Sequence, residues 1–137
     1  LPASPNLTLT LNIPTSGDAT NISSNTDASD KLAYISIVPS GKARKITASI
    51  TIGALQAGLR MNLVAGTPGG VGARGTPTGG INFTSVTTGG DLITGVGSGW
   101  TGNAGSVLSY TLWLDDPTGV IQTSNVLTIE YTLTEAQ

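Results

Sequence analysis

Apolar and polar residues alternate one by one along several segments of this chain, and this pattern is the strongest constraint on its fold. A period of two puts every second side chain on the same face of a β-strand. Residues 7–13 read LTLTLNI, with aliphatic side chains at every odd position. The same alternation recurs in residues 46–52, 59–65, 107–114 and 126–134. The sequence therefore predicts strands that have one buried face and one face in water.

The composition agrees with an all-β fold. The chain has 19 glycines and many Ser and Thr residues, which disfavour helix because glycine loses much backbone entropy and Thr is β-branched. Further strands are expected over 32–38, 81–86 and 92–96, a single helical turn over 53–58, and an exposed, irregular glycine-rich loop over 66–80. Strands at this spacing, about seven in all, predict an immunoglobulin-like β-sandwich.

Residue types that are absent restrict the function. The chain has no Cys and no His, so it lacks thiol chemistry and the commonest acid–base group and metal ligand. Only 10% of residues are charged and the net charge is −2, which argues against nucleic-acid binding. No stretch approaches the roughly 18 apolar residues that would span a membrane. We therefore expect no enzymatic activity, no cofactor and no metal, and the low charge favours an extracellular protein.

Two local motifs have simple explanations. Residues 70–75 match the dinucleotide-binding pattern G-x-G-x-x-G, but Pro77 prevents the helix that such a site needs. Asp18, Asp27 and Asp30 could offer oxygen ligands to calcium, yet they lack the spacing of an EF-hand loop. Neither motif is interpreted as a binding site.

The N-terminal strand is separate from the others. Residues 1–14 form this unit, Pro5 and Pro14 flank its strand, and polar residues 15–30 separate it from residues 31–137. Its apolar face consists of Leu7, Leu9, Leu11 and Ile13. Two arrangements fit this pattern. The strand could fold back on its own sandwich, or it could insert into a neighbouring subunit, where main-chain hydrogen bonds would give affinity and alternate side chains would fill pockets.

This layout resembles that of the chaperone–usher pilins. That family has an N-terminal extension of alternating hydrophobic residues, an immunoglobulin-like sandwich that lacks one strand, and a last strand of the kind seen here as NVLTIEYTLT at 125–134. The disulfide found in many such pilins is missing. The resemblance implies that residues 1–14 are a donor strand, 15–30 a linker and 31–137 an incomplete sandwich. Leu7, Leu9, Leu11 and Ile13 would fill a groove between strands 32–38 and 126–134.

The resemblance implies a structural subunit of an extracellular, pilus-like filament. Its partners would be identical subunits, an assembly chaperone and a host or surface glycan. A carbohydrate-binding or other recognition module is the alternative, and it would rest on Tyr34, Trp100 and the glycine-rich loops. Trp100 is otherwise expected to be a buried anchor of its loop. A jelly-roll capsid or spike protein is a third possibility.

Overall fold

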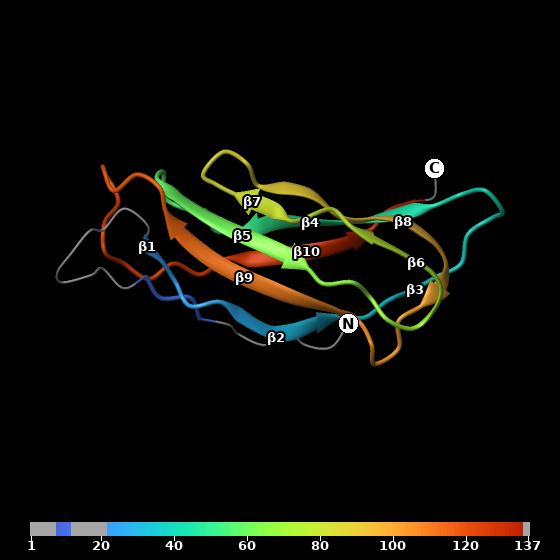
Figure 1. Cartoon of the computed structure of the whole chain (residues 1–137). Coiled ribbons are helices and arrows are strands. Elements are labelled where there is room, and N and C mark those ends of the chain that lie inside the picture. Colours follow the sequence, from blue (N-terminus) through green and yellow to red (C-terminus); the bar gives the residue numbers. More distant parts are fainter. Residues whose placement is uncertain (1–7, 12–21, 136–137) are drawn as a thin grey trace.

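The computed structural model describes residues 8–11 and 22–135, and it shows two antiparallel five-stranded β-sheets (Figure 1). The first sheet contains β1 (Ile22–Ser23), β2 (Asp27–Leu32), β5 (Leu59–Ala65), β7 (Ile81–Phe83) and β9 (Ser106–Leu114). The second contains β3 (Ile35–Ser36), β4 (Arg44–Ile52), β6 (Val71–Pro77), β8 (Gly89–Trp100) and β10 (Thr128–Leu133). The prediction of an all-β protein built from two packed sheets is confirmed.

Helices are absent from the part of the chain that the structure describes, so it contains no helix that is long and apolar enough to cross a membrane. The single turn expected over residues 53–58 does not form. Gly53 and Gly58 have φ angles of +82° and +97°, outside the right-handed helical region. Leu55 between them is buried in the core, which draws this segment inward as a loop.

The strands pair as a nested series. β5 pairs with β7, β4 with β8 and β2 with β9, so the chain is organised as one long hairpin wound into two layers. The order is β2–β9–β5–β7 in the first sheet and β10–β4–β8–β6 in the second. Strand β10 lies outside the nest and adds to the free side of β4. Within the described residues, β2 and β10 therefore each have one unpaired edge.

The sandwich is elongated, and its two ends carry different segments (Figure 1). The β1 end holds β1 and residues 53–58 and 115–127. The β3 end holds β3, the start of β6 and the end of β8.

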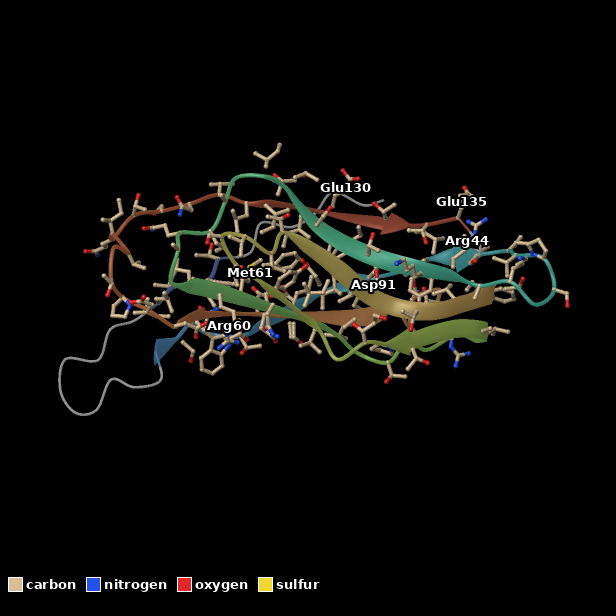
Figure 2. All side chains as sticks on the ribbon, turned by 90° about the horizontal axis from the view of Figure 1, so that it is seen from above. Arg44, Arg60, Met61, Asp91, Glu130 and Glu135 are labelled. Atoms are coloured by element: carbon tan, nitrogen blue, oxygen red, sulfur yellow. The ribbon has the colours of Figure 1, made fainter. Side chains whose placement is uncertain are left out.

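The core lies between the sheets and follows the alternation of the sequence. In β5, Leu59, Met61 and Leu63 are buried while the residues between them are partly exposed. Figure 2 shows Met61 between the ribbons, whereas Glu130 projects outward from β10. The largest fully buried side chains include Phe83 of β7, which lies opposite Met61 in the register. The period-two pattern thus predicts the buried face of this sheet correctly.

Strand β8 extends well beyond the predicted segment 92–96 because it is bulged. Leu92 and Ile93 are neighbours, yet both are fully buried, which strict alternation does not allow. The register of β8 against β4 shifts on both sides of Ile46. Such bulges add a residue and turn side chains to the other face. A sequence search for strict alternation therefore finds only part of this strand.

The prediction of an irregular loop over residues 66–80 is wrong, because residues 71–77 form the edge strand β6. Its glycines serve close strand pairing. Gly72 has a φ of +83°, and a Cβ atom there would lie 2.4 Å from the carbonyl oxygen of Ser98. Only glycine lets the two strands approach in this way.

Arg74 holds the turn before β6 in place. Its guanidinium donates hydrogen bonds to the carbonyl oxygens of Pro68 (3.2 Å), Gly70 (2.7 Å) and Gly72 (3.2 Å). The Tyr34 hydroxyl donates to the carbonyl oxygen of Arg74 at 2.5 Å. These bonds satisfy carbonyl groups of the glycine-rich turn and of β6 itself.

Part of the segment predicted to be a polar linker, 15–30, also forms strands. Residues 22–23 belong to β1 and β2 begins at Asp27, while residues 15–21 lie outside the described chain. Both strands pair with β9. Their pairing depends on main-chain hydrogen bonds, so it needs few apolar side chains and leaves no hydrophobic signal in the sequence.

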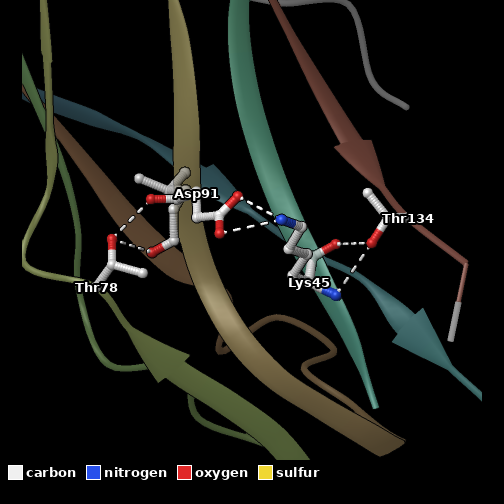
Figure 3. A network of polar contacts seen from close by, with 5 residues as sticks. Lys45, Thr78, Asp91 and Thr134 are labelled. Carbon is white, nitrogen blue, oxygen red and sulfur yellow. Dashed lines mark hydrogen bonds and ion pairs between the residues drawn. The ribbon is translucent and has the colours of Figure 1, made fainter. Parts of the chain in front are cut away.

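A polar network ties the C-terminal end of β10 to its sheet (Figure 3). The Thr134 amide and hydroxyl both donate to the carbonyl oxygen of Lys45, at 2.9 and 3.1 Å. Lys45 Nζ lies 3.0 Å from Asp91 Oδ1, and Thr78 Oγ1 donates to the Asp91 carbonyl oxygen at 2.8 Å. The ion pair is nearly half exposed and adds only about 0–1 kcal/mol. The bonds of Thr134 to the main chain therefore fix where β10 ends.

The contacts of Arg74 lead to a first prediction. Arg74→Ser leaves three carbonyl groups without their charged donor and should lower the free energy of unfolding by roughly 1–3 kcal/mol. Val71→Ser, on the same strand, should change it by less than about 0.5 kcal/mol, because Val71 is largely exposed. Urea denaturation of both variants measures the difference. Equal stability of the two variants would show that the Arg74 bonds do not hold the segment.

Candidate subunit-binding groove

A groove of about 1460 Å³ runs along the open side of the sandwich, between the free edges of β2 and β10. Both sheets, residues 8–11 and part of the segment 115–127 line it. It includes Leu32 and Ala33 on one side and Thr128 and Ile129 on the other. Of the two strands between which the resemblance places a groove, 32–38 and 126–134, the lining includes residues 32–33 and residues 126–129 and 131.

The floor of the groove is apolar because alternate residues of two neighbouring strands face it. β9 supplies Leu108, Tyr110, Leu112 and Leu114, and β5 supplies Leu59 and Met61. Of the β9 residues, Leu108 and Tyr110 are buried, whereas Leu112 and Leu114 are only partly covered. An apolar surface that stays partly open to water along a free sheet edge favours binding of another strand.

The segment 115–127 forms the wall of the groove next to β10. Gln56 fixes this segment: its side chain donates to the Ile121 carbonyl oxygen at 3.1 Å and accepts from the Ile121 amide at 2.9 Å. Val120 and Leu127 pack against the core from this wall. Two hydrogen bonds from one amide side chain thus position an extended segment that has no strand partner of its own.

Residues 8–11 lie against the other edge of the groove. Leu11 pairs antiparallel with Ser24. The Thr10 amide donates to Asn25 Oδ1 at 3.2 Å, and Asn25 Nδ2 donates to the Thr8 carbonyl oxygen at 3.4 Å. In the isolated chain this part of the N-terminal segment therefore folds back on its own domain.

The structure places two of the four predicted donor residues at the groove. Leu9 and Leu11 are half-buried and pack against the core, while Thr8 and Thr10 are exposed. Leu7 and Ile13 lie outside the described residues. The alternation read from the sequence therefore holds for the described part of the strand, with its aliphatic side chains toward the groove.

Two tyrosines join the sheets across the floor. Tyr110 on β9 and Tyr131 on β10 share a hydrogen bond between their hydroxyl groups. Burial raises the pKa of both phenols, and the negative charge of Asp30 raises each pKa further. For Tyr131, the bond from Tyr110 also raises the pKa. For Tyr110 the bond to Tyr131 acts in the opposite direction, but the net shift of its pKa is still upward. Both phenols therefore keep their protons to a higher pH than an unperturbed tyrosine does.

Sequence reasoning did not identify the tyrosine pair or the wall of the groove. A signal for the pair is present, because Tyr110 and Tyr131 occupy buried-face positions of the two best alternating segments, 107–114 and 126–134. The wall had no such signal. Residues 120–127 are predominantly exposed and have no regular apolar alternation, and Gln56 from a distant loop holds them in place.

The acidic residues that the sequence offered as calcium ligands do not form a cluster in the described part of the chain. Asp27 accepts hydrogen bonds from the amide and hydroxyl of Ser29, which lower its pKa. No three acidic side chains within the described ranges gather as they would around a metal ion.

The expectation that Trp100 is a buried anchor is wrong. It ends β8 on the outer face and is 52% exposed, because Thr101 occupies the buried position beside it.

Comparison with known proteins gives no relative for this chain. No protein-family model, no curated protein and no solved structure matches it. The function must therefore be argued from the groove and the surface of this chain.

The tyrosine pair leads to a prediction of pH dependence. Unfolded tyrosine has a pKa of about 10, and the folded values are raised, so the contribution is fully present below about pH 10 and is lost as the pH rises further. The free energy of unfolding should fall by about 1.4 kcal/mol per pH unit for each tyrosine that stays protonated only in the folded state. Tyr131→Phe should reduce this slope by one such increment. Urea denaturation from about pH 9 to 11 measures the slope for the unaltered chain and for Tyr131→Phe. Identical slopes for the two proteins would contradict the raised pKa of Tyr131.

Proposed function

We propose that this chain is a structural subunit of an extracellular filament, in which the N-terminal strand of each copy fills the groove of the next. The observation that supports this is the apolar groove between the unpaired edges of β2 and β10, with Leu9 and Leu11 already directed at it. The subunit needs no catalytic group, cofactor or metal for this role. More specifically, we propose that the domain is immunoglobulin-like and that a donated strand completes it.

The energetics of strand donation are favourable. Each aliphatic side chain buried in the groove contributes roughly 1.5–3 kcal/mol. Leu7, Leu9, Leu11 and Ile13 together would offset most of the entropy lost when a short extension becomes ordered. Main-chain hydrogen bonds to the free edge of β10 or β2 would fix the register of the donated strand and slow its dissociation.

The same groove suggests what happens before assembly. An empty apolar groove beside two open edges invites aggregation. An assembly chaperone that lends a strand to the groove would protect the subunit until the next copy arrives. Self-coverage by residues 8–11, as in the isolated chain, would serve the same purpose.

The strand order favours a second candidate function. In an immunoglobulin sandwich the first strand pairs with the second in sequence, whereas here β2 pairs with β9. The nested pairs β5–β7, β4–β8 and β2–β9 are those of a double-sheet jelly roll, a fold of capsid and lectin domains. A coat or spike subunit would form closed shells or small oligomers, which negative-stain microscopy separates from filaments.

Substitution within the donor strand tests the main proposal. Leu11→Arg would place an unpaired charge in the groove and should abolish polymers that resist mild denaturant. Thr10→Ser keeps the exposed face polar and should assemble like the unaltered chain. Electrophoresis without boiling measures the ladder of multimers. A full ladder from Leu11→Arg would contradict strand donation.

Removal of the strand distinguishes exchange from self-coverage. The chain shortened to residues 19–137 should be unstable or prone to aggregate, and a synthetic peptide of residues 1–14 should restore its stability in trans. Thermal denaturation with and without the peptide measures the rescue. A shortened chain that is a stable monomer and is indifferent to the peptide would refute the mechanism.

A further inference from the structure

Asn25 lies at the junction of β1 and β2, where the edge of the first sheet carries one extra residue. Between the pairings of Ser24 and Asp27 with β9, two residues of this edge oppose a single residue, Thr111. Thr26 takes the place opposite Thr111, since their hydroxyl groups share a hydrogen bond of 2.8 Å. Asn25 is therefore the extra residue of a bulge, and a bulge re-aims the side chain that it carries.

Ser24, the residue before Asn25, has a partner on each side. On the β9 side, its amide donates to the Leu112 carbonyl oxygen at 2.7 Å, and its hydroxyl accepts from the Leu112 amide at 2.8 Å. The hydroxyl thus takes the place of the main-chain carbonyl that accepts in a regular antiparallel pair. On the other side, Ser24 pairs antiparallel with Leu11. The edge of the first sheet therefore accepts one more strand beside Ser24.

Next to this bridge, the side chain of Asn25 bonds the main chain of the N-terminal strand. Its Oδ1 accepts from the Thr10 amide at 3.2 Å, and its Nδ2 donates to the Thr8 carbonyl oxygen at 3.4 Å. A residue of a parallel neighbouring strand bonds the same two groups, the carbonyl of one residue and the amide two positions further on. A side-chain amide carries both a donor and an acceptor. Asn25 therefore replaces one main-chain residue of a partner strand.

These two bonds agree with the face of the strand that enters the groove. They engage main-chain groups of Thr8 and Thr10, whose side chains are exposed, and they lie on either side of Leu9, which packs against the core. A shift by one residue would offer Asn25 the groups of odd-numbered residues and turn the threonines toward the apolar floor. The bonds of Asn25 and the floor of the groove therefore select the same register.

We propose that Asn25 is the residue by which the groove recognises the N-terminal strand, first in its own chain and, after exchange, in a neighbouring copy. This inference rests on the proposed function. Exchange of an identical element between copies keeps the contacts that the element makes within one chain. The partner segment is therefore residues 8–11 of a second copy, with Leu11 opposite Ser24 as in the isolated chain.

Introduced cysteines test this register, since the chain has no Cys of its own. Residues paired in antiparallel strands have Cα atoms about 4.5–5.5 Å apart, which suits a disulfide. A full chain with Leu11→Cys, mixed with a full chain with Ser24→Cys, should form a disulfide between two copies, detected by mass. Thr10→Cys in place of Leu11→Cys is the matched control. It should link at most about a tenth as much, because its side chain points to the other face.

A full chain with both Leu11→Cys and Ser24→Cys separates this inference from strand donation. At low protein concentration it should form the disulfide within one copy, and failure to do so would overturn the register. A link within one copy without any link in the mixture would refute strand donation, and with it the exchange that this inference assumes. Equal linkage of Thr10→Cys and Leu11→Cys in the mixture would overturn the register alone, while strand donation would stand.

A substitution of Asn25 itself tests the role of its side chain. Asn25→Asp keeps the acceptor for the Thr10 amide but places a carboxylate oxygen against the Thr8 carbonyl oxygen. Polymers of this variant should dissociate in mild denaturant roughly three- to tenfold faster than those of the unaltered chain. Asn62→Asp is the matched control, because Asn62 on β5 also loses a side-chain hydrogen bond, to Asn82, but lies outside the groove. Equal dissociation rates for the two variants would overturn the role of Asn25.

Low pH gives a readout that a merely structural role of Asn25 would not move. Below about pH 4 the carboxyl group of Asn25→Asp gains a proton, so it can again donate to the Thr8 carbonyl oxygen. The dissociation rate of this variant should then approach that of the unaltered chain at the same pH. A ratio of the two rates that is as large at low pH as at neutral pH would overturn the bond to Thr8 as the means of recognition.

Discussion

The open side of the sandwich is the constraint on which the rest of this structure depends. Within the described residues β7 and β6 are the edge strands at one side of the two sheets, and β2 and β10 are those at the other side, where the apolar groove lies between them. Unpaired edges beside an apolar floor attract any extended chain. Residues 8–11 cover part of this side in the isolated chain.

The width of the groove is set by polar contacts rather than by packing alone. The Tyr110–Tyr131 hydrogen bond holds β9 and β10 at one separation across the two sheets. Thr134 fixes the far end of β10 through the main chain of Lys45. Buried polar bonds are directional, so they specify one geometry where apolar contacts would allow several. In the proposed strand donation, an incoming strand would therefore meet a preformed site, which would lower the entropy cost of binding.

The sequence predicted the strands whose alternation is strict and missed those that depend on the main chain. Residues 59–65 and 107–114 were found because their buried faces are aliphatic or aromatic at every second position. Strands β2 and β6 were not found, because β2 is polar and β6 is rich in glycine, so each depends on main-chain pairing. The order of strands could not be derived from one sequence, because many pairings of similar strands satisfy the same pattern. The groove lies between strands that are far apart in the chain, so its lining could be identified only once the strand order was known.

The low charge of the chain makes the proposed strand donation depend on shape and register. With 10% charged residues the chain has little electrostatic means of orienting a partner. In the proposed mode, edge hydrogen bonds would set the register of an incoming strand, and aliphatic side chains at every second position would decide which of its faces enters the groove. A shift of one residue would turn Thr8 and Thr10 toward the apolar floor, so the alternation of residues 7–13 would supply the selectivity that charge does not.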